Sequence, residues 1–197
     1  VGLILLCSAL AARAEPPATH DWPVTGGDAG GSRYSPLADI DRSNVAKLGV
    51  VWTYHQGDFY DGGWLPDYVN KGTAMETTPI VVDGRLYVTS TWSMVYAFDA
   101  KTGALLWQHD PEVPRQWAVH LCCDAVNRGV AAWGGKVFVG TIDGRLVSLD
   151  ARTGKKRWEV NTIDRTKPYS ITGAPRVVKD KVLIGNGGAE MGVRGYL

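Results

Sequence analysis

Two adjacent cysteines, Cys122 and Cys123, are the most unusual chemical feature of this 197-residue sequence. Consecutive Cα atoms are held about 3.8 Å apart, whereas disulfides usually span about 4.4–6.8 Å, so a bond between neighbours closes a strained eight-membered ring. Two thiols, or two bonds to other molecules, are the alternatives, because Cys7 lies in a segment that we expect to be removed. A bridged pair would offer a flat, rigid, apolar platform for stacking against a planar cofactor.

Four further side chains in loops have the chemistry to bind a ligand. The Arg128 guanidinium can form two parallel hydrogen bonds with a ligand carboxylate. A carboxylate in a glycine-rich turn, as at Glu190, suits a hard cation such as Ca²⁺. Glu76 and Thr172 occupy similar loop positions, just before or after predicted strands. Each residue also has a structural interpretation, with Arg128 as an ion pair between neighbouring sheets and the glutamates as solvated turn residues.

Most other catalytic and binding motifs are absent from the sequence. The four histidines show no metal-ligand spacing such as HExxH, and there is no GxSxG elbow or P-loop. The glycine-rich stretch 185–192 does not fit GxGxxG, and no helical pattern follows it. With 21 Lys and Arg against 20 Asp and Glu, the net charge of +1 also argues against a nucleic-acid partner bound through a basic patch.

A gapless repeat with an offset of 51 residues positions these side chains. Segment 84–107 aligns with segment 135–158, and each contains short β-branched and aromatic runs between glycine turns. The turns DAKTG and DARTG place a glycine where a positive φ is needed. Each segment ends in a tryptophan that can cover the gap between neighbouring sheets. An earlier partial strand is expected at 48–54, where LGVVWTY ends in a similar aromatic cluster.

This rhythm of three or four short strands in about 50 residues is typical of a β-propeller blade. We therefore predict an all-β propeller with repeats near 84–110 and 135–160, and a third that begins near 180 and is cut short. A β-sandwich with coincidental internal similarity is the competing fold. Propellers close with about 4–8 blades, so this chain is expected to be an incomplete portion of one. The loops that carry the candidate residues should gather at one end of the propeller channel.

The first 14 residues, VGLILLCSALAARA, are typical of a secretory signal peptide. Their apolar run is too short to span a membrane permanently, and it ends in an Ala-x-Ala cleavage pattern. A lipoprotein interpretation of Cys7 is disfavoured, because Leu6 fits poorly before a lipidated cysteine. The sequence thus predicts residues 1–14 as an export signal, residues 15–197 as the propeller portion, and a periplasmic location in which disulfides are stable.

The combination of motifs resembles the quinoprotein alcohol dehydrogenases, the methanol/ethanol dehydrogenase family that uses pyrroloquinoline quinone (PQQ). The resemblance covers nearly all of the predicted mature chain. Its most specific parts are METTP beginning at Met75, LCCDAVNRGVA at 121–131, SITGAPRVV at 170–178 and GNGGAEMGVRGYL at 185–197. It implies an eight-bladed propeller with PQQ buried on its axis, of which this chain is an N-terminal portion.

The resemblance also implies roles for individual residues. Cys122 and Cys123 match a vicinal disulfide that packs against one face of the PQQ ring. Glu76 and Arg128 match contacts to the polar edge of PQQ, and Glu190 matches a ligand of the metal, usually Ca²⁺ and in some members a lanthanide. Further cofactor contacts match Thr172, Gly187, Gly188 and Ala189, although some members carry serine in place of Gly187.

The implied reaction is the oxidation of a small primary alcohol to an aldehyde, with electrons passed to a cytochrome c. It needs an aspartate base that the family carries downstream of GGAE, so we expect no catalytic residue in this chain and no dehydrogenase activity from the chain alone. The alternative function is a non-enzymatic periplasmic propeller, a scaffold of the outer-membrane assembly type. A scaffold would share the AFDAKTG blades but would have no need for adjacent cysteines beside NRG.

Overall fold

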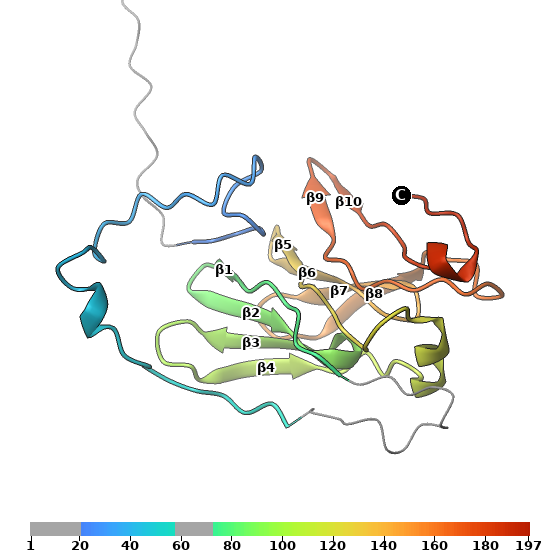
Figure 1. Ribbon diagram of the computed structural model, residues 1–197, viewed down its shortest axis with the longest axis horizontal. Coiled ribbons are helices and arrows are strands. Elements are labelled where there is room, and N and C mark those ends of the chain that lie inside the picture. Colours follow the sequence, from blue (N-terminus) through green and yellow to red (C-terminus); the bar gives the residue numbers. More distant parts are fainter. Residues whose placement is uncertain (1–20, 58–72) are drawn as a thin grey trace, which may run out of the picture.

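The computed structural model describes residues 21–57 and 73–197, so the predicted signal peptide at 1–14 lies outside the described residues. Within these ranges the chain forms antiparallel sheets and short 3-10 helices (Figure 1). The first sheet has the order β1 (Ile80–Val82), β2 (Arg85–Thr89), β3 (Val95–Asp99), β4 (Leu105–His109). The second has the order β5 (Ala131–Trp133), β6 (Lys136–Gly140), β7 (Arg145–Asp150), β8 (Lys156–Asn161). A third, two-stranded sheet pairs β9 (Arg176–Val178) with β10 (Lys181–Leu183).

The two four-stranded sheets are structural copies of one another, as the 51-residue repeat predicts. The register between the third and fourth strands shifts at Ala97/Phe98 in the first sheet and at Ser148/Leu149 in the second, positions that the repeat aligns. β10 falls where the third copy is predicted to begin. The repeat predicts the last three strands of each copy, but it does not predict the three-residue first strands β1 and β5.

A continuous apolar core joins the first two sheets face to face. Its buried residues alternate along the strands, as expected where one side of a pleated sheet is covered. They come from both sheets and from the segment before β5: Ile80, Tyr87, Val95, Ala97, Trp107, Val130, Val137, Val139, Val147 and Leu149. Burial of each of the larger aliphatic side chains favours folding by about 1.5–3 kcal/mol, so this core fixes one sheet against the next.

Trp107, at the centre of β4, packs on the turn of the following sheet. Its indole N–H donates a hydrogen bond to the carbonyl of Ala151 at 3.0 Å. A Cβ added to Gly154 would lie 2.6 Å from Cδ2 of this ring, and Gly154 has a φ of +70°. The prediction that the repeated tryptophan covers the gap between sheets is therefore confirmed for Trp107, as is the positive φ of the turn glycine. Trp52 packs in the same way on Gly103. The counterpart of Trp107 in the second copy, Trp158, is 39% exposed.

The expected strand at 48–54 is wrong, because this segment forms no ladder with any described strand. Val50 and Val51 are 86% and 84% exposed. The aromatic residues of the segment nevertheless pack as the repeat suggests, with the Tyr54 ring 4.8 Å from that of Phe98. A strand requires a hydrogen-bonded neighbour, whereas an aromatic contact requires only a surface.

The first strand of each sheet (β1, β5 and β9) and the loop that precedes it set the position of the site. β5 lies against β9, so the second sheet meets the third along their first strands (Figure 1). The short helices η4 (Arg115–His120) and η5 (Ala189–Met191) lie at one end of the molecule, and η1 (Val45–Lys47) lies on an extended arm at the other (Figure 1). Across the described residues, no helix combines the length and the apolar character needed to cross a membrane.

Candidate functional site

Three loops that lead into the first strands of successive sheets meet at Arg128. Glu76 lies in the loop before β1, Arg128 before β5 and Thr172 before β9. The Arg128 guanidinium lies with Nη2 2.7 Å from Oε2 of Glu76, and its Nη1 donates to Oγ1 of Thr172 at 2.5 Å. The structure thus brings together three of the residues that the sequence marks as cofactor contacts.

Main-chain hydrogen bonds fix the same three loops to one another. The N–H of Thr78 donates to the carbonyl of Arg128 at 3.2 Å, and the N–H of Arg128 donates to the carbonyl of Thr172 at 2.9 Å. The Arg128 and Glu76 side chains remain 48% and 44% exposed. An ion pair this exposed contributes only about 0–1 kcal/mol to stability, so stability alone does not account for a charged pair at the junction of three loops.

A buried polar cluster that sequence reasoning missed lies directly behind this junction. It consists of Thr77, Thr89 and Asn127, with Thr89 and Asn127 almost completely buried. The hydroxyls of Thr77 and Thr89 are 2.8 Å apart, and the hydroxyl of Thr89 donates to the carbonyl of Asn127 at 3.1 Å. The sequence did hold one indication of this cluster: Thr77 directly follows Glu76, and Asn127 directly precedes Arg128.

Cys122 and Cys123 follow η4 and are exposed, with their Sγ atoms 2.7 Å apart in a hydrogen-bonding contact. That contact is the main cause that raises the pKa of Cys122, and partial burial and the negative charge of Glu190 act in the same direction. A thiol with a raised pKa stays protonated near neutral pH, so it is a poor nucleophile. The disulfide implied by the family resemblance stays a prediction.

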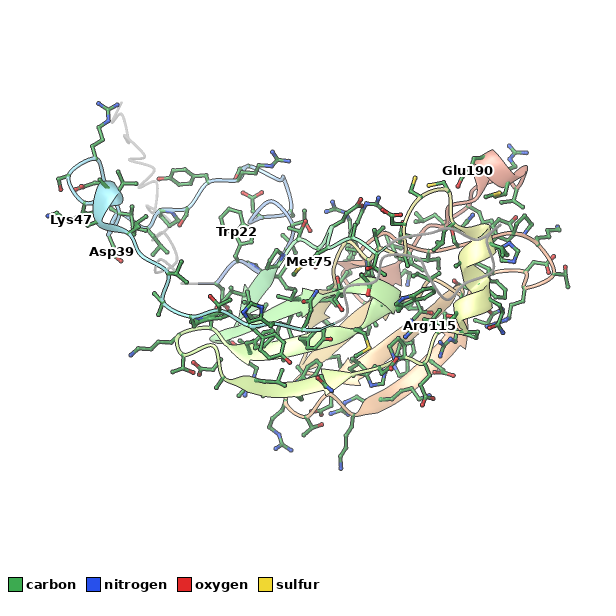
Figure 2. The ribbon with its side chains drawn as sticks, turned by 60° about the horizontal axis from the view of Figure 1, so that its bottom comes forward. Trp22, Asp39, Lys47, Met75, Arg115 and Glu190 are labelled. Carbon is green, nitrogen blue, oxygen red and sulfur yellow. The ribbon has the colours of Figure 1, made fainter. Side chains whose placement is uncertain are left out.

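Glu190 lies on η5, which a glycine turn places beside the cysteines. Its carboxylate lies close enough to the Cys122 thiol to help raise the pKa of that thiol. Gly188 has a φ of +117°, and a Cβ there would lie 2.6 Å from the carbonyl oxygen of Pro168, so only glycine fits. Figure 2 shows Glu190 at the same end of the molecule as Arg115 of η4, far from Asp39 and Lys47 on the arm.

Backbone pairing ties this glycine turn to the loop that carries Thr172. The N–H of Gly187 donates to the carbonyl of Ser170 at 2.7 Å, and the reverse bond is 3.4 Å. A Cβ on Gly187 would meet Ser170 only at ordinary contact distances, the shortest being 3.5 Å, so a serine fits here sterically. Ala189 begins η5 and is exposed.

The predicted metal ligand, Glu190, does not belong to a cluster of acidic, histidine or cysteine side chains in the described part of the chain. In residues 21–57 and 73–197 no three His, Cys, Asp or Glu side chains converge in a way that could hold a metal ion. Glu190 therefore stands as one candidate oxygen ligand.

These observations define a class of protein: a β-propeller portion whose loop end presents polar side chains and a pair of cysteines. A guanidinium, a carboxylate and a hydroxyl at one junction can bind the polar edge of a ligand, and the exposed sulfurs can contact an apolar face. This arrangement suits a planar molecule with charged substituents.

Comparison with known proteins identifies the family. Residues 22–191 match the model of the PQQ family described as "Glucose/ethanol/alcohol dehydrogenase, beta-propeller domain". The chain belongs to this family of quinoprotein dehydrogenase β-propellers.

Individual relatives agree with this assignment. The 1-butanol dehydrogenase (cytochrome c) of Thauera butanivorans is 56% identical over 178 residues, which cover 90% of this chain and 24% of the relative. The crystal structure of the quinohemoprotein alcohol dehydrogenase of Comamonas testosteroni is 48% identical with a TM-score of 0.80, and the match covers 93% of this chain and 26% of that one. A europium-containing methanol dehydrogenase is 40% identical with a TM-score of 0.72, covering 89% of this chain and 29% of that one.

The chain spans about a quarter of the length of these relatives. The family assignment therefore concerns the portion of a propeller that this chain represents.

Proposed function

We propose that this chain is part of a PQQ-dependent alcohol dehydrogenase that oxidises small primary alcohols to aldehydes. The observation that carries the proposal is the junction at Arg128, where a half-exposed guanidinium contacts Glu76 and Thr172 from two neighbouring loops. A ligand that binds these half-exposed charged groups would account for their presence at the junction. The relatives' names support the substrate class, since they include 1-butanol dehydrogenase and quinohemoprotein alcohol dehydrogenase.

The side chains present fit PQQ. Arg128 matches the anionic carboxylates of PQQ, because a guanidinium donates two parallel hydrogen bonds to a carboxylate. Glu76 and Thr172 fix the orientation of that guanidinium. Cys122 and Cys123, as neutral thiols or as a disulfide, present an uncharged sulfur surface suited to one face of the ring. When bound, PQQ supplies the quinone that accepts hydride from the alcohol, and the protein supplies binding and orientation.

Glu190 fits one position in the coordination of Ca²⁺ or a lanthanide, both of which prefer oxygen ligands. The glycine turn from Gly187 to Ala189 holds this carboxylate at the end of the molecule that also carries the cysteines. One structural relative is a methanol dehydrogenase that contains europium, which supports a lanthanide as an alternative to Ca²⁺. The remaining ligands and the proton-accepting base are proposed to come from other parts of the protein.

We further propose that the protein is exported to the periplasm and delivers electrons to a cytochrome c. Support for export comes from the apolar run and Ala-x-Ala pattern of residues 1–14. Support for the acceptor comes from the name of the Thauera relative, which specifies cytochrome c.

The test begins with the DNA downstream of Leu197 and with the protein expressed from its complete reading frame. The proposal predicts further blades, an aspartate base and a tryptophan for the second face of PQQ. It also predicts dye-linked alcohol oxidation that requires both PQQ and Ca²⁺ or a lanthanide. A full-length protein that binds no PQQ and oxidises no alcohol would instead be a propeller scaffold, and the proposal would fall.

A further inference from the structure

The loops that carry Glu76 and Arg128 are connected underneath by hydrogen bonds that do not involve either charged group. Thr77 Oγ1 accepts a hydrogen bond from the N–H of Thr89 at 3.1 Å, and the two hydroxyl oxygens are 2.8 Å apart. The hydroxyl of Thr89 in turn lies 3.1 Å from the carbonyl oxygen of Asn127. A path of hydrogen bonds therefore runs from the residue after Glu76 to the residue before Arg128.

The number of protons that each group can donate determines which atom is the donor in each of these hydrogen bonds. A carbonyl oxygen only accepts, so the single hydroxyl proton of Thr89 is committed to Asn127. The 2.8 Å contact between the hydroxyls must then use the proton of Thr77, which donates to Thr89. Each hydroxyl in the path is thus both donor and acceptor, and neither can rotate without breaking a bond.

Asn127 anchors the other end of the path to the second sheet. Its side-chain N–H donates to the carbonyl of Gly140, at the end of β6, at 2.9 Å, and its Oδ1 accepts from the N–H of Gly129 at 3.0 Å. Asn127 is 1% exposed and Thr89, on β2, is fully buried. Buried polar groups are costly to leave unpaired, so the strands β2 and β6 hold the path rigidly.

We infer that Thr77, Thr89 and Asn127 are positioning residues that set the distance between the Glu76 and Arg128 loops before a ligand arrives. The inference rests on the proposed function in one respect, namely that the ligand bound at these loops is PQQ. The exposed ion pair cannot do this alone, since such pairs contribute little to stability. With the two loops fixed from below, binding of the ligand does not have to order them, which favours affinity.

The test uses three variants of the full-length protein. Thr89→Val keeps the shape of the buried side chain but removes both hydrogen bonds of the hydroxyl. Thr89→Ser restores the hydroxyl and is the rescue variant. Thr162→Val is the matched control, because the half-buried Thr162 hydroxyl also donates to a backbone carbonyl, that of Gly144 at 2.9 Å, away from the Glu76 and Arg128 loops.

Two measurements are made on each variant: the dissociation constant for PQQ, and hydrogen exchange of the Thr78 and Arg128 amides in the absence of PQQ. Because an unpaired buried polar group costs about 1–3 kcal/mol and about 1.4 kcal/mol is tenfold in affinity, we expect Thr89→Val to weaken PQQ binding by roughly 5- to 140-fold. Exchange at both amides should rise in the same variant. Thr89→Ser should recover most of the affinity, and Thr162→Val should lose stability without loss of PQQ affinity.

The outcomes separate this inference from the proposed function. If Thr89→Val binds PQQ as tightly as the unmodified protein, or if Thr162→Val loses affinity equally, the positioning role is wrong while the cofactor assignment stands. If the unmodified protein binds no PQQ, the proposed function fails. In that case exchange at the Thr78 and Arg128 amides still decides whether the path holds the loops, since it should rise in Thr89→Val and not in the control.

Discussion

Replacement of Gly154 by alanine tests whether the contact between Trp107 and the next sheet contributes to stability. The new Cβ would lie 2.6 Å from both Cδ2 and Cε3 of the Trp107 ring, closer than carbon atoms approach one another. The ring would have to move, and its hydrogen bond to the carbonyl of Ala151 would weaken or break. The substitution therefore disturbs one well-defined contact between two sheets.

Substitution of a second glycine, Gly135, separates the cost of displacing the Trp107 ring from the cost of backbone strain. Gly135 also has a φ of +70°, but a Cβ there would meet no atom within 4 Å. Gly135→Ala should therefore show only the cost of a left-handed alanine, about 1 kcal/mol in the free energy of unfolding. Gly154→Ala adds the displacement of a packed ring, for which about 1–3 kcal/mol is typical. We expect it to lower the free energy of unfolding by about 2 kcal/mol more than the control does.

Urea denaturation of the two variants, followed by tryptophan fluorescence, measures this difference. Combining Gly154→Ala with Trp107→Leu should remove the steric conflict, so the two substitutions should be less destabilising together than the sum of the single effects. If Gly154→Ala costs no more than Gly135→Ala, the Trp107 contact does not couple the sheets as described.

Three further predictions concern the site and its supporting turn. Arg128→Lys cannot keep both the Glu76 and Thr172 contacts of the guanidinium, so PQQ affinity in the full-length protein should fall by roughly tenfold, and an unchanged dissociation constant would contradict the site. Gly188→Ala should lower the Ca²⁺ occupancy of the full-length protein, measured by elemental analysis, because the new Cβ clashes with the backbone. Gly187→Ser has room for its side chain and should retain the metal. Equal losses of metal in both variants would show that the turn geometry is not the cause. The hydrogen bond from Arg157 is the main cause that lowers the pKa of Asp150 from 3.8 to about 2. The stabilisation from that carboxylate is thus present above about pH 4 and lost as the pH falls through about 2. The unfolding free energies of the protein and of D150N should therefore converge between pH 6 and pH 2, and a gap independent of pH would refute this.

The features that could be predicted from sequence are those encoded within one repeat. The turn that ends in Gly154 and the strand that ends near Trp107 recur at a fixed spacing, so both their existence and their contact were foreseeable. The first strands β1 and β5 were not, because three residues are too few to show a period of two. The segment 48–54 has strand-like composition, but composition does not reveal whether a pairing partner is present.

In the candidate site, too, the residues within sequence motifs could be predicted, whereas a contact between distant residues could not. The family motifs marked Glu76, Arg128 and Thr172, and the structure places them in direct contact. Thr89 carried no such mark, since it is one residue in a β-branched strand and its partner Asn127 lies 38 residues away. Its role depends on which loops become neighbours when two sheets pack together, and a single sequence does not specify that.

The contact between Trp107 and its neighbour also has a consequence for the order of folding. The indole reaches a carbonyl 44 residues further along the chain, in the turn of the second sheet. The last strand of the first sheet, β4, therefore cannot complete its packing until that turn is in place. Folding of the first sheet is thus finished by its successor, wherever in the cell the protein folds.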